Sequence, residues 1–256
     1  MKRLFLMITA VLLSMHMMNG AEVQEEIFTV NGVSFTMVTV EGGTFIMGDS
    51  GSQSLAHEVT LSGFSIGQTE VTQELWLAVM GYNPSEFGSV MPEDLQRPVE
   101  NVTWEMCQEF IARLNGLTGC EFRLPTEAQW EFAARGGNLS QGYRFAGSDD
   151  AGEVAWYNSN SPSITDTGYG TQTVGGKVPN ELGLYDMSGN VFEFCQDWFG
   201  AYGSEAVTDP TGPETGAKRV ARGGSWKSVS NVCSTTSRQR CGVRDAANVY
   251  GLRLAL

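Results

Sequence analysis

The feature that most constrains the fold is a long central stretch, residues 138–182. It consists mostly of Gly, Asn, Ser, Asp and Thr with isolated aromatic residues, among them Tyr143, Phe145, Trp156 and Tyr157. Such a loop loses much conformational entropy on folding unless its own side chains or a bound cation hold its shape. Gly and Pro are spread through the rest of the chain, without an internal repeat, a low-complexity run or a charged linker. The sequence therefore predicts one loop-rich domain in which a structural ion would have a use.

Length and composition exclude several classes of protein. A chain of 256 residues with 41% hydrophobic and 18% charged residues can bury roughly 70–75% of its unfolded surface in one core, so it needs no staple to fold. There are only two histidines, His16 and His57. Because His16 falls in a predicted leader, a two-His iron site or a three-His zinc site is excluded.

The first residues have the pattern of a secretory signal peptide, predicted here to span residues 1–21. Two basic residues precede an apolar run from Leu4 to Leu13, and Asn19, Gly20 and Ala21 precede an acidic start. The apolar run is too short for a membrane span, and small residues suit cleavage near Ala21. No later segment approaches 18 apolar residues, so we expect an exported protein without membrane insertion. Residues 22–34 are expected to be an N-terminal extension of a domain at 35–256.

Charge is distributed unevenly. Residues 22–217 carry 6 basic and 28 acidic side chains, whereas residues 218–256 carry 8 basic and 1 acidic. Two interpretations of the basic end stay open: its arginines pair with carboxylates of the acidic body, or they form a face for an anionic or polar ligand. Nucleic-acid binding is not expected, because an isoelectric point near 4.6 is far from that of proteins that bind phosphate backbones.

The sequence pattern predicts short strands and three short helices. Residues 35–40 and 44–47 are expected to be strands around a tight turn at Gly42 and Gly43. Helices are expected from Thr72 to Met80, from Thr103 to Asn115 with a stop at Gly116, and from the capping box at Thr126 to Gly136. Cys107 falls on the apolar side of the second helix and is expected to be buried.

Six motifs in a fixed order resemble those of the formylglycine-generating enzyme family, also called the sulfatase-modifying-factor domain. They are Gly42–Gly48 (GGTFIMG), Glu70–Thr72 (EVT), Pro98–Trp104 (PVENVTW), Arg123–Gly137 (RLPTEAQWEFAARGG), Gly183–Phe194 (GLYDMSGNVFEF) and Arg222–Trp226 (RGGSW). The resemblance covers about residues 35–256. It implies an α+β fold, a variant of the C-type lectin fold with little regular secondary structure and long loops.

The resemblance also implies a structural calcium site. Side-chain oxygens of Asp186 and Glu193 and backbone carbonyls of Gly189 and Val191 match the positions by which the family binds calcium. Calcium prefers hard oxygen donors of this kind. A loop closed only by hydrogen bonds from Asp186 and Asn190 is the alternative.

Oxidase activity is the second possibility that the resemblance raises. The family's enzymes oxidise a cysteine in a sulfatase's Cys-x-Pro-x-Arg segment with oxygen and a copper(I) ion held by a Cys-x4-Cys pair. Here the first position of the pair is Ser228 and only the second, Cys233, has sulfur. A hydroxyl is a poor copper(I) ligand, and Cys241 stands at the wrong spacing. Under this alternative alone, Cys233 is expected to be the catalytic residue, copper the cofactor and a sulfatase the partner.

We therefore favour a binding module similar to the secreted or surface members of the family that lack the cysteine pair. In those proteins the ligand-facing residues lie after the Arg-Gly-Gly-Ser-Trp motif. The corresponding ligand-binding residues here are Trp226, Ser228, Ser230, Asn231, Arg238 and Arg240. Polar groups around a Trp platform suit a protein or glycan ligand. A structural component of a surface assembly is a third possibility.

Overall fold

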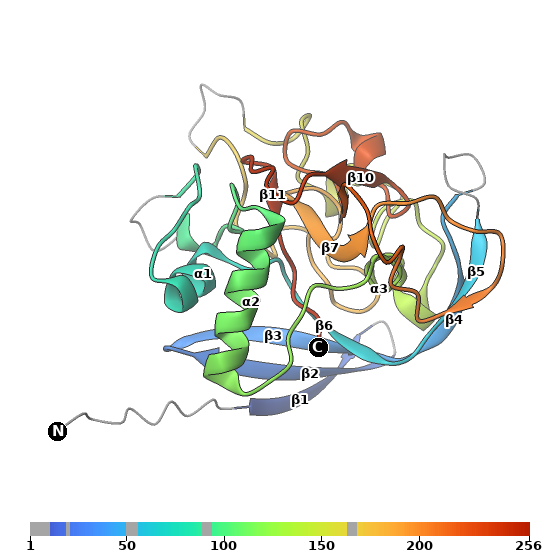
Figure 1. Ribbon diagram of the computed structural model, residues 1–256, viewed down its shortest axis with the longest axis horizontal. Coiled ribbons are helices and arrows are strands. Elements are labelled where there is room, and N and C mark those ends of the chain that lie inside the picture. The colour runs from blue at the N-terminus through green and yellow to red at the C-terminus, as the bar shows by residue number, and fades with distance from the viewer. Residues whose placement is uncertain (1–10, 19–20, 50–55, 89–93, 163–167) are drawn as a thin grey trace.

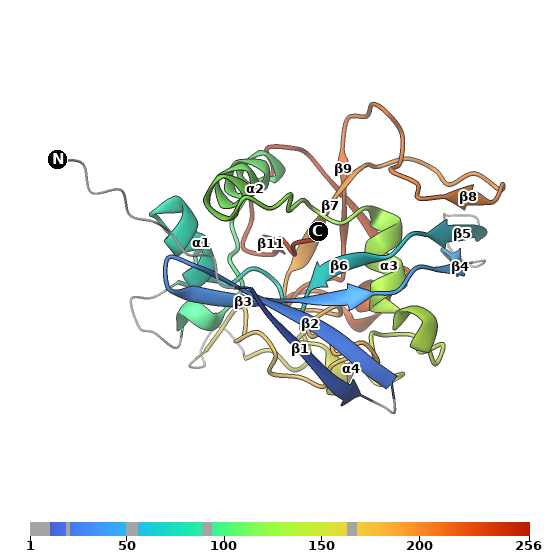
Figure 2. The same cartoon turned by 90° about the horizontal axis from the view of Figure 1, so that it is seen from below.

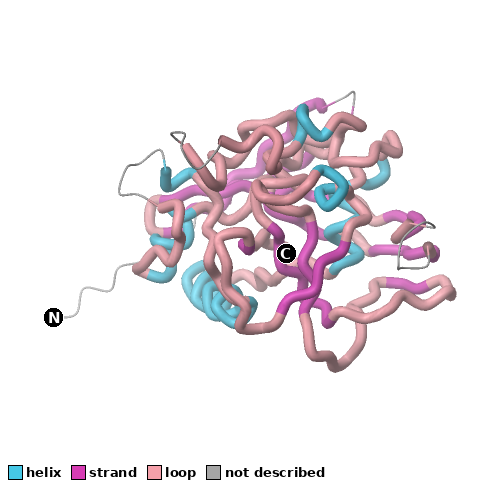
Figure 3. The backbone as a smooth tube through the Cα atoms, turned by 90° about the horizontal axis from the view of Figure 1, so that it is seen from above, coloured by secondary structure: helices cyan, strands magenta, loops and turns pink. Residues whose placement is uncertain are grey.

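The computed structural model describes residues 11–18, 21–49, 56–88, 94–162 and 168–256. It has a mixed α+β architecture in which loops exceed helices and strands (Figures 1 and 3). The predicted fold class, α+β with low regular structure and long loops, is confirmed. Within the described residues there is no helix both long and apolar enough to cross a membrane.

The N-terminal sheet has the strand order β1-β2-β3-β6 and lies along one side of the molecule (Figure 1). Its strands are β1 (Val11–Met18), β2 (Ala21–Val30), β3 (Val33–Val40) and β6 (Phe64–Gly67). β2 and β3 form a hairpin whose two turn residues, Asn31 and Gly32, both have positive φ (48° and 86°), as the twist of a tight hairpin requires. Phe28 and Val30 of β2 are buried. The structure thus extends the domain to the N-terminal side of the predicted boundary at residue 35, and it pairs β1, from the predicted leader, with β2.

Two further sheets complete the strand structure. The central sheet, in the order β10-β9-β7-β11, contains β7 (Phe192–Trp198), β9 (Arg219–Arg222), β10 (Arg238–Cys241) and β11 (Tyr250–Gly251). A third, in the order β4-β5-β8, contains β4 (Gly43–Met47), β5 (His57–Leu61) and β8 (Val207–Thr208) and lies at one end of the molecule (Figure 2). The two strands predicted around Gly42 both form, but β3 and β4 belong to different sheets, because each pairs with a later strand.

The three predicted helices are present. α1 (Gln73–Met80) ends at Gly81, and Thr72 caps its first turn by accepting from the Leu75 amide. α3 (Glu127–Ala134) begins with the predicted Thr126–Gln129 capping box. α2 (Trp104–Thr118) is longer than predicted: it passes through Gly116 and ends at Gly119, whose φ of 73° suits a helix C-cap. Gly116 did not stop the helix because Leu114, a buried residue, and Leu117 continue to pack on the core around it.

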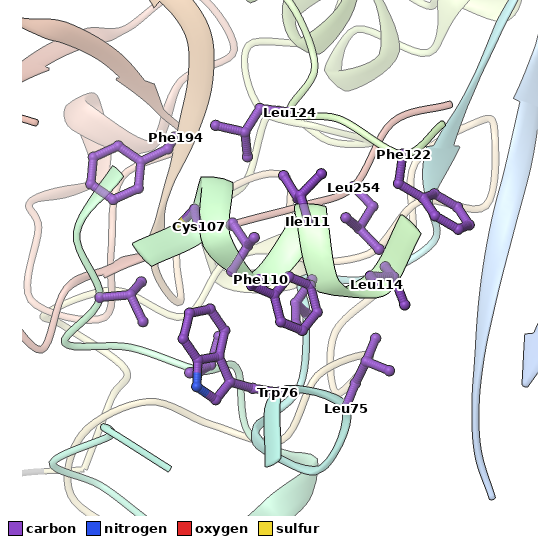
Figure 4. Close-up of a cluster of buried hydrophobic side chains, with 14 of the residues drawn as sticks. Leu75, Trp76, Cys107, Phe110, Ile111, Leu114, Phe122, Leu124, Phe194 and Leu254 are labelled. Carbon is purple, nitrogen blue, oxygen red and sulfur yellow. The ribbon is translucent and has the colours of Figure 1, made fainter. Parts of the chain in front are cut away.

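The main core lies between α1, α2 and the N-terminal and central sheets (Figure 4). Trp76 of α1 and Phe110 of α2 stack with ring centroids 4.9 Å apart. Cys107 lies on the same buried face of α2, as predicted. A second buried cluster packs α3 against strands of the N-terminal sheet and of the sheet β4-β5-β8.

The central stretch, residues 138–182, is held largely by its own side chains. Its described residues, 138–162 and 168–182, contain only the short helix α4 (Ala151–Val154) and part of the 3₁₀ turn η2 (Gly137–Leu139). Asn180 donates from Nδ2 to the Ala133 carbonyl, and Lys177 donates from Nζ to the Gly152 carbonyl. The remaining 3₁₀ turns are η1 (Asp94–Gln96) and η3 (Ser230–Cys233). The predicted internal fastening is therefore present in hydrogen bonds between side chains and backbone.

Candidate functional site

The C-terminal basic segment holds the central sheet to the rest of the domain. Arg222 of β9 is fully buried; its Nη2 pairs with Oε2 of Glu131 on α3 and also donates to the Thr235 carbonyl. Burial disfavours the charge of Arg222, but Glu131, Tyr202 and Glu127 outweigh this and raise its pKa. The pair therefore ties the central sheet to α3 with both charges held in the interior.

Four other arginines of this segment also contact acidic or aromatic side chains. Arg253 donates from Nη2 and Nε to Glu193 of β7 at 2.6 and 3.1 Å, and it donates to the carbonyls of Gly67 and Tyr185. Arg238 forms a bidentate pair with Glu127 of α3, at 2.6 and 2.7 Å. Arg219 lies between the rings of Trp104 and Trp198, and Arg244 pairs with Glu105 at the surface. The structure thus supports carboxylate pairing for most of the arginines, whereas Arg240 is exposed with no ion pair to a described residue.

The residues do not fit a copper(I) site. Cys233 is buried in an apolar cluster with Phe145, Val154 and Ala155, and burial raises the pKa of its thiol to about 12. All five cysteines are described and free, and Cys241 lies in a different cluster. The Ser228 hydroxyl is hydrogen-bonded to Ser225. A copper(I) site needs accessible thiolates, and this arrangement does not supply them.

The predicted calcium residues lie on one buried loop before and within β7. Oδ2 of Asp186 accepts from the Gly175 amide at 2.7 Å, while its Oδ1 is buried and has no hydrogen-bond partner in the part of the chain that the structure describes. Burial raises the pKa of Asp186 to about 6. The carboxylate of Glu193 is occupied by Arg253 and by the Trp130 indole. Asp186 thus has an oxygen that suits a cation, whereas at Glu193 an arginine supplies the positive charge; calcium at Asp186, Gly189, Val191 and Glu193 stays a prediction.

Trp226 does not form an open platform in this structure. Its side chain is only 4% exposed, its Nε1 donates to the Asn248 carbonyl, and its ring packs edge-on against Phe87 and Tyr169. An indole with a satisfied donor inside an aromatic cluster stabilises the fold. The buried Trp226 therefore fixes the backbone at the start of the segment that follows it.

The exposed part of the C-terminal segment begins immediately after Trp226. Lys227, Val229 and Asn231 are exposed, and Val229 is 55% exposed although it is apolar. Asn231 accepts through Oδ1 from Nη2 of Arg144 at 2.9 Å. The backbone of Arg144 in turn accepts from the Thr235 amide. The segment 227–236 and the loop around residue 144 therefore form one surface, which we call the C-terminal face.

A hollow of about 370 Å³ lies at this face. It is lined by Thr235 and Thr236 from the C-terminal segment and by residues of two other regions, including Ile46, Arg135, Tyr143 and Arg144. Its polar groups, one aromatic ring and an exposed apolar side chain match the mixed character of ligand-binding surfaces.

The structure brings together only part of the predicted ligand set. Ser230 and Asn231 lie on the C-terminal face, Ser228 is half-buried and bonded to Ser225, Arg238 is engaged by Glu127, and Trp226 is buried. Tyr143 and Arg144 were missed. The available signal was an aromatic residue followed by a basic one in a stretch with few basic residues, but nothing in the sequence pairs residue 144 with residue 231.

Comparison with known proteins places this geometry in a family. The profile described as "Sulfatase-modifying factor enzyme 1-like domain" matches residues 25–256. The chain is 34% identical to the chaperone protein LppX of Paenibacillus barcinonensis, over 87% of this chain and 89% of that protein. It is 32% identical to the formylglycine-generating enzyme of Thermomonospora curvata, over 70% of this chain and 63% of the enzyme.

Among solved structures, the Treponema denticola variable protein 1 aligns with a TM-score of 0.83 and 34% identity, covering 90% of this chain and 98% of that one. CarF aligns with a TM-score of 0.65 and 26% identity, covering 86% of this chain and 97% of CarF.

Proposed function

We propose that the chain, which belongs to the family of the sulfatase-modifying factor enzyme 1-like domain, acts by binding. Its Cys233 is a buried thiol, and a serine stands at the other position of the family's cysteine pair. The chain is proposed to be an exported module that binds a protein or glycan ligand through the C-terminal face. The observation that carries the proposal is the contrast within one segment: Cys233 is buried, while Val229 and Asn231 are exposed and Thr235 and Thr236 line a hollow.

A protein ligand is favoured over a glycan. Val229 and Ile46 are each 55% exposed and apolar; Ile46 lines the hollow together with Arg144, and Arg144 is hydrogen-bonded to Asn231 of the segment. Exposed aliphatic side chains beside an arginine are typical of protein interfaces. Relatives named as a chaperone and as a variable protein support a role in binding other macromolecules.

Site-specific photo-crosslinking in the producing cell tests this proposal. A photoreactive amino acid replaces Val229 on the C-terminal face or, as a matched control, Val207, which is exposed on β8. We expect a discrete crosslinked product from position 229, absent from position 207 and reduced when Asn231 is replaced by Ala. Equal crosslinking from both positions, or none from position 229, would contradict the proposal.

The oxidase alternative is tested separately. The purified protein is incubated with copper(I), oxygen and a Cys-x-Pro-x-Arg peptide, and the peptide mass is followed. We expect no conversion of cysteine to formylglycine. Conversion that disappears in Cys233→Ser would overturn the binding proposal in favour of the enzyme.

Export and calcium binding are further parts of the proposal. Export predicts a mature N-terminus near residue 22, which N-terminal sequencing of the extracytoplasmic protein would show. Calcium binding at Asp186, with the carbonyls of Gly189 and Val191, predicts that calcium raises the midpoint of thermal unfolding, since a ligand of the native state stabilises it. The increase should disappear in Asp186→Asn, and a midpoint unchanged by calcium would remove the ion from the proposal.

A further inference from the structure

A second hollow lies next to the C-terminal face. Its volume is about 660 Å³, and it is lined by residues from two segments, 138–143 and 178–181, and by Gly147. This volume is in the range of sites for small ligands or for a side chain of a partner. Tyr143 lines both this hollow and the one at the C-terminal face, so one ligand can reach both.

The charge of the second hollow comes from Glu181. It is the one charged side chain among the described residues that line the hollow. Glu181 is only 5% exposed; its Oε1 accepts from the Gln141 amide at 3.0 Å, whereas its Oε2, packed against Gly136, is buried and has no hydrogen-bond partner among the described residues. An unsatisfied oxygen on a buried carboxylate costs free energy, which a cationic donor can recover.

The backbone around Glu181 is held in place. Asn180 donates from Nδ2 to the Ala133 carbonyl and accepts through Oδ1 from the amides of Leu182 and Leu184. The carboxylate is therefore positioned before any ligand binds, which lowers the ordering cost of binding.

The other walls of the hollow suit an aliphatic stem. Val178 is 56% exposed, Tyr143 is 39% exposed, and Pro179 lies between Val178 and the fixed Asn180. Arginine and lysine pack their stems on apolar surface while the charged head pairs with an acid. An arginine can also stack on a tyrosine ring. The net charge of −13 attracts basic partners to the whole surface.

We propose that this hollow binds an arginine or lysine side chain of the protein partner, with Glu181 as the counter-charge and Tyr143 and Val178 as the walls. The inference rests on the proposed function and names the chemistry of the partner at one subsite. A neutral sugar would use the tyrosine ring but would leave the charge of Glu181 unpaired.

Amide NMR spectra of the purified protein test the subsite directly. The probes are N-acetyl-arginine methylamide and its neutral isostere, N-acetyl-citrulline methylamide. We expect the arginine probe to shift the amide signals of Gln141 and Gly147, and the citrulline probe to bind at least about tenfold more weakly, because the charge-assisted hydrogen bond is lost.

Two matched variants locate the effect. Glu181→Gln keeps an oxygen that can accept from the Gln141 amide and removes only the charge, whereas Glu121→Gln removes an equal charge from an exposed residue that does not line the hollow. We expect Glu181→Gln to weaken arginine binding about tenfold and Glu121→Gln to leave it unchanged. An unchanged far-ultraviolet and near-ultraviolet circular dichroism spectrum shows that each variant is folded.

Several results would overturn the inference: no shifts at any soluble concentration of the arginine probe, equal binding of the citrulline probe, wild-type affinity in Glu181→Gln, or tighter binding of maltose than of arginine. Failure here is distinguishable from failure of the proposed function, because crosslinking from position 229 reports on the C-terminal face, whereas binding of the arginine probe reports on the hollow at Glu181. Crosslinking without arginine binding would reject only the subsite, and arginine binding without crosslinking would reject only the C-terminal face.

Discussion

Two parts of the same basic segment differ in how completely they are held. Arg222, Arg238 and Arg253 lie inside or half-inside the domain, each paired with a glutamate of α3 or β7. Residues 227–231, between β9 and β10, are mostly at the surface, and Asn231 is held by one bond from Arg144. Neighbouring parts of one segment thus differ, because the arginines pair with acidic residues of α3 and β7 while the loop 227–231 does not. Substitutions in the first part should change stability, and those in the second should change binding.

The largest effect is expected at Arg253. Arg253→Leu leaves Glu193 buried without its counter-charge and close to Glu70, whose pKa is already raised by burial and by the charges of Asp186 and Glu193. We expect a loss of about 3–5 kcal/mol in the free energy of unfolding, as for other broken buried pairs. Urea denaturation measures it, and Arg240→Leu, at an exposed arginine, is the control. A loss no larger than that of the control would show that the interior pair does not fasten the fold.

A smaller loss is expected at the pair that ties β10 to α3. Glu127→Gln leaves Arg238 without its bidentate partner, although Arg238 still donates to the Gly200 carbonyl and stacks on Tyr202. These remaining contacts should limit the loss to about 2 kcal/mol, within the range for hydrogen bonds to charged groups. The same denaturation series tests it. Stability equal to that of the wild type would show that Glu131, and not Glu127, accounts for the stabilisation by these ion pairs.

The fastened part should also respond to pH through Asp197. Burial, with the nearby charge of Glu127, raises the pKa of Asp197 to about 7, above the ordinary value near 4. Between these values the native state holds a proton that the unfolded state has lost, so this group makes stability fall as pH rises from about 4 to about 7. Asp197→Asn should remove that part, so the variant should gain about 3 kcal/mol in stability relative to the wild type between pH 4.5 and pH 8. A pH-independent difference in stability would contradict the assignment.

The smallest effect on stability is expected on the C-terminal face. Asn231→Ala removes one bond from the exposed Arg144, so the free energy of unfolding should change by less than about 0.5 kcal/mol. Binding of the crosslinked partner should nevertheless weaken severalfold. Lys227→Ala is an informative second variant, because its side chain is exposed on the same loop. A large stability loss in Asn231→Ala would abolish the distinction between the two parts.

Local signals in the sequence predicted local structure well. The helices begin at the predicted residues Thr72, Thr103 and Thr126, each of which caps its helix, and Cys107 is buried on the apolar face of α2. Gly116 was misinterpreted as a helix stop, since helix length depends on whether the next turn finds a core to pack against. The pairing of β3 and β4 with other strands was likewise beyond a reading of neighbouring residues.

The sequence by itself determined the family, the α+β class, the helix caps and the loss of the first cysteine of the copper pair, since each depends on residue identities at fixed spacing. The tertiary structure decided which arginines are counter-charges, that Trp226 is buried, and that Tyr143 and Arg144 join the C-terminal segment at one surface. These outcomes depend on contacts between residues far apart in the chain, such as Arg144 with Asn231 and Arg253 with Glu193. Burial and charge pairing arise only when such segments meet, so spacing along the chain does not encode them.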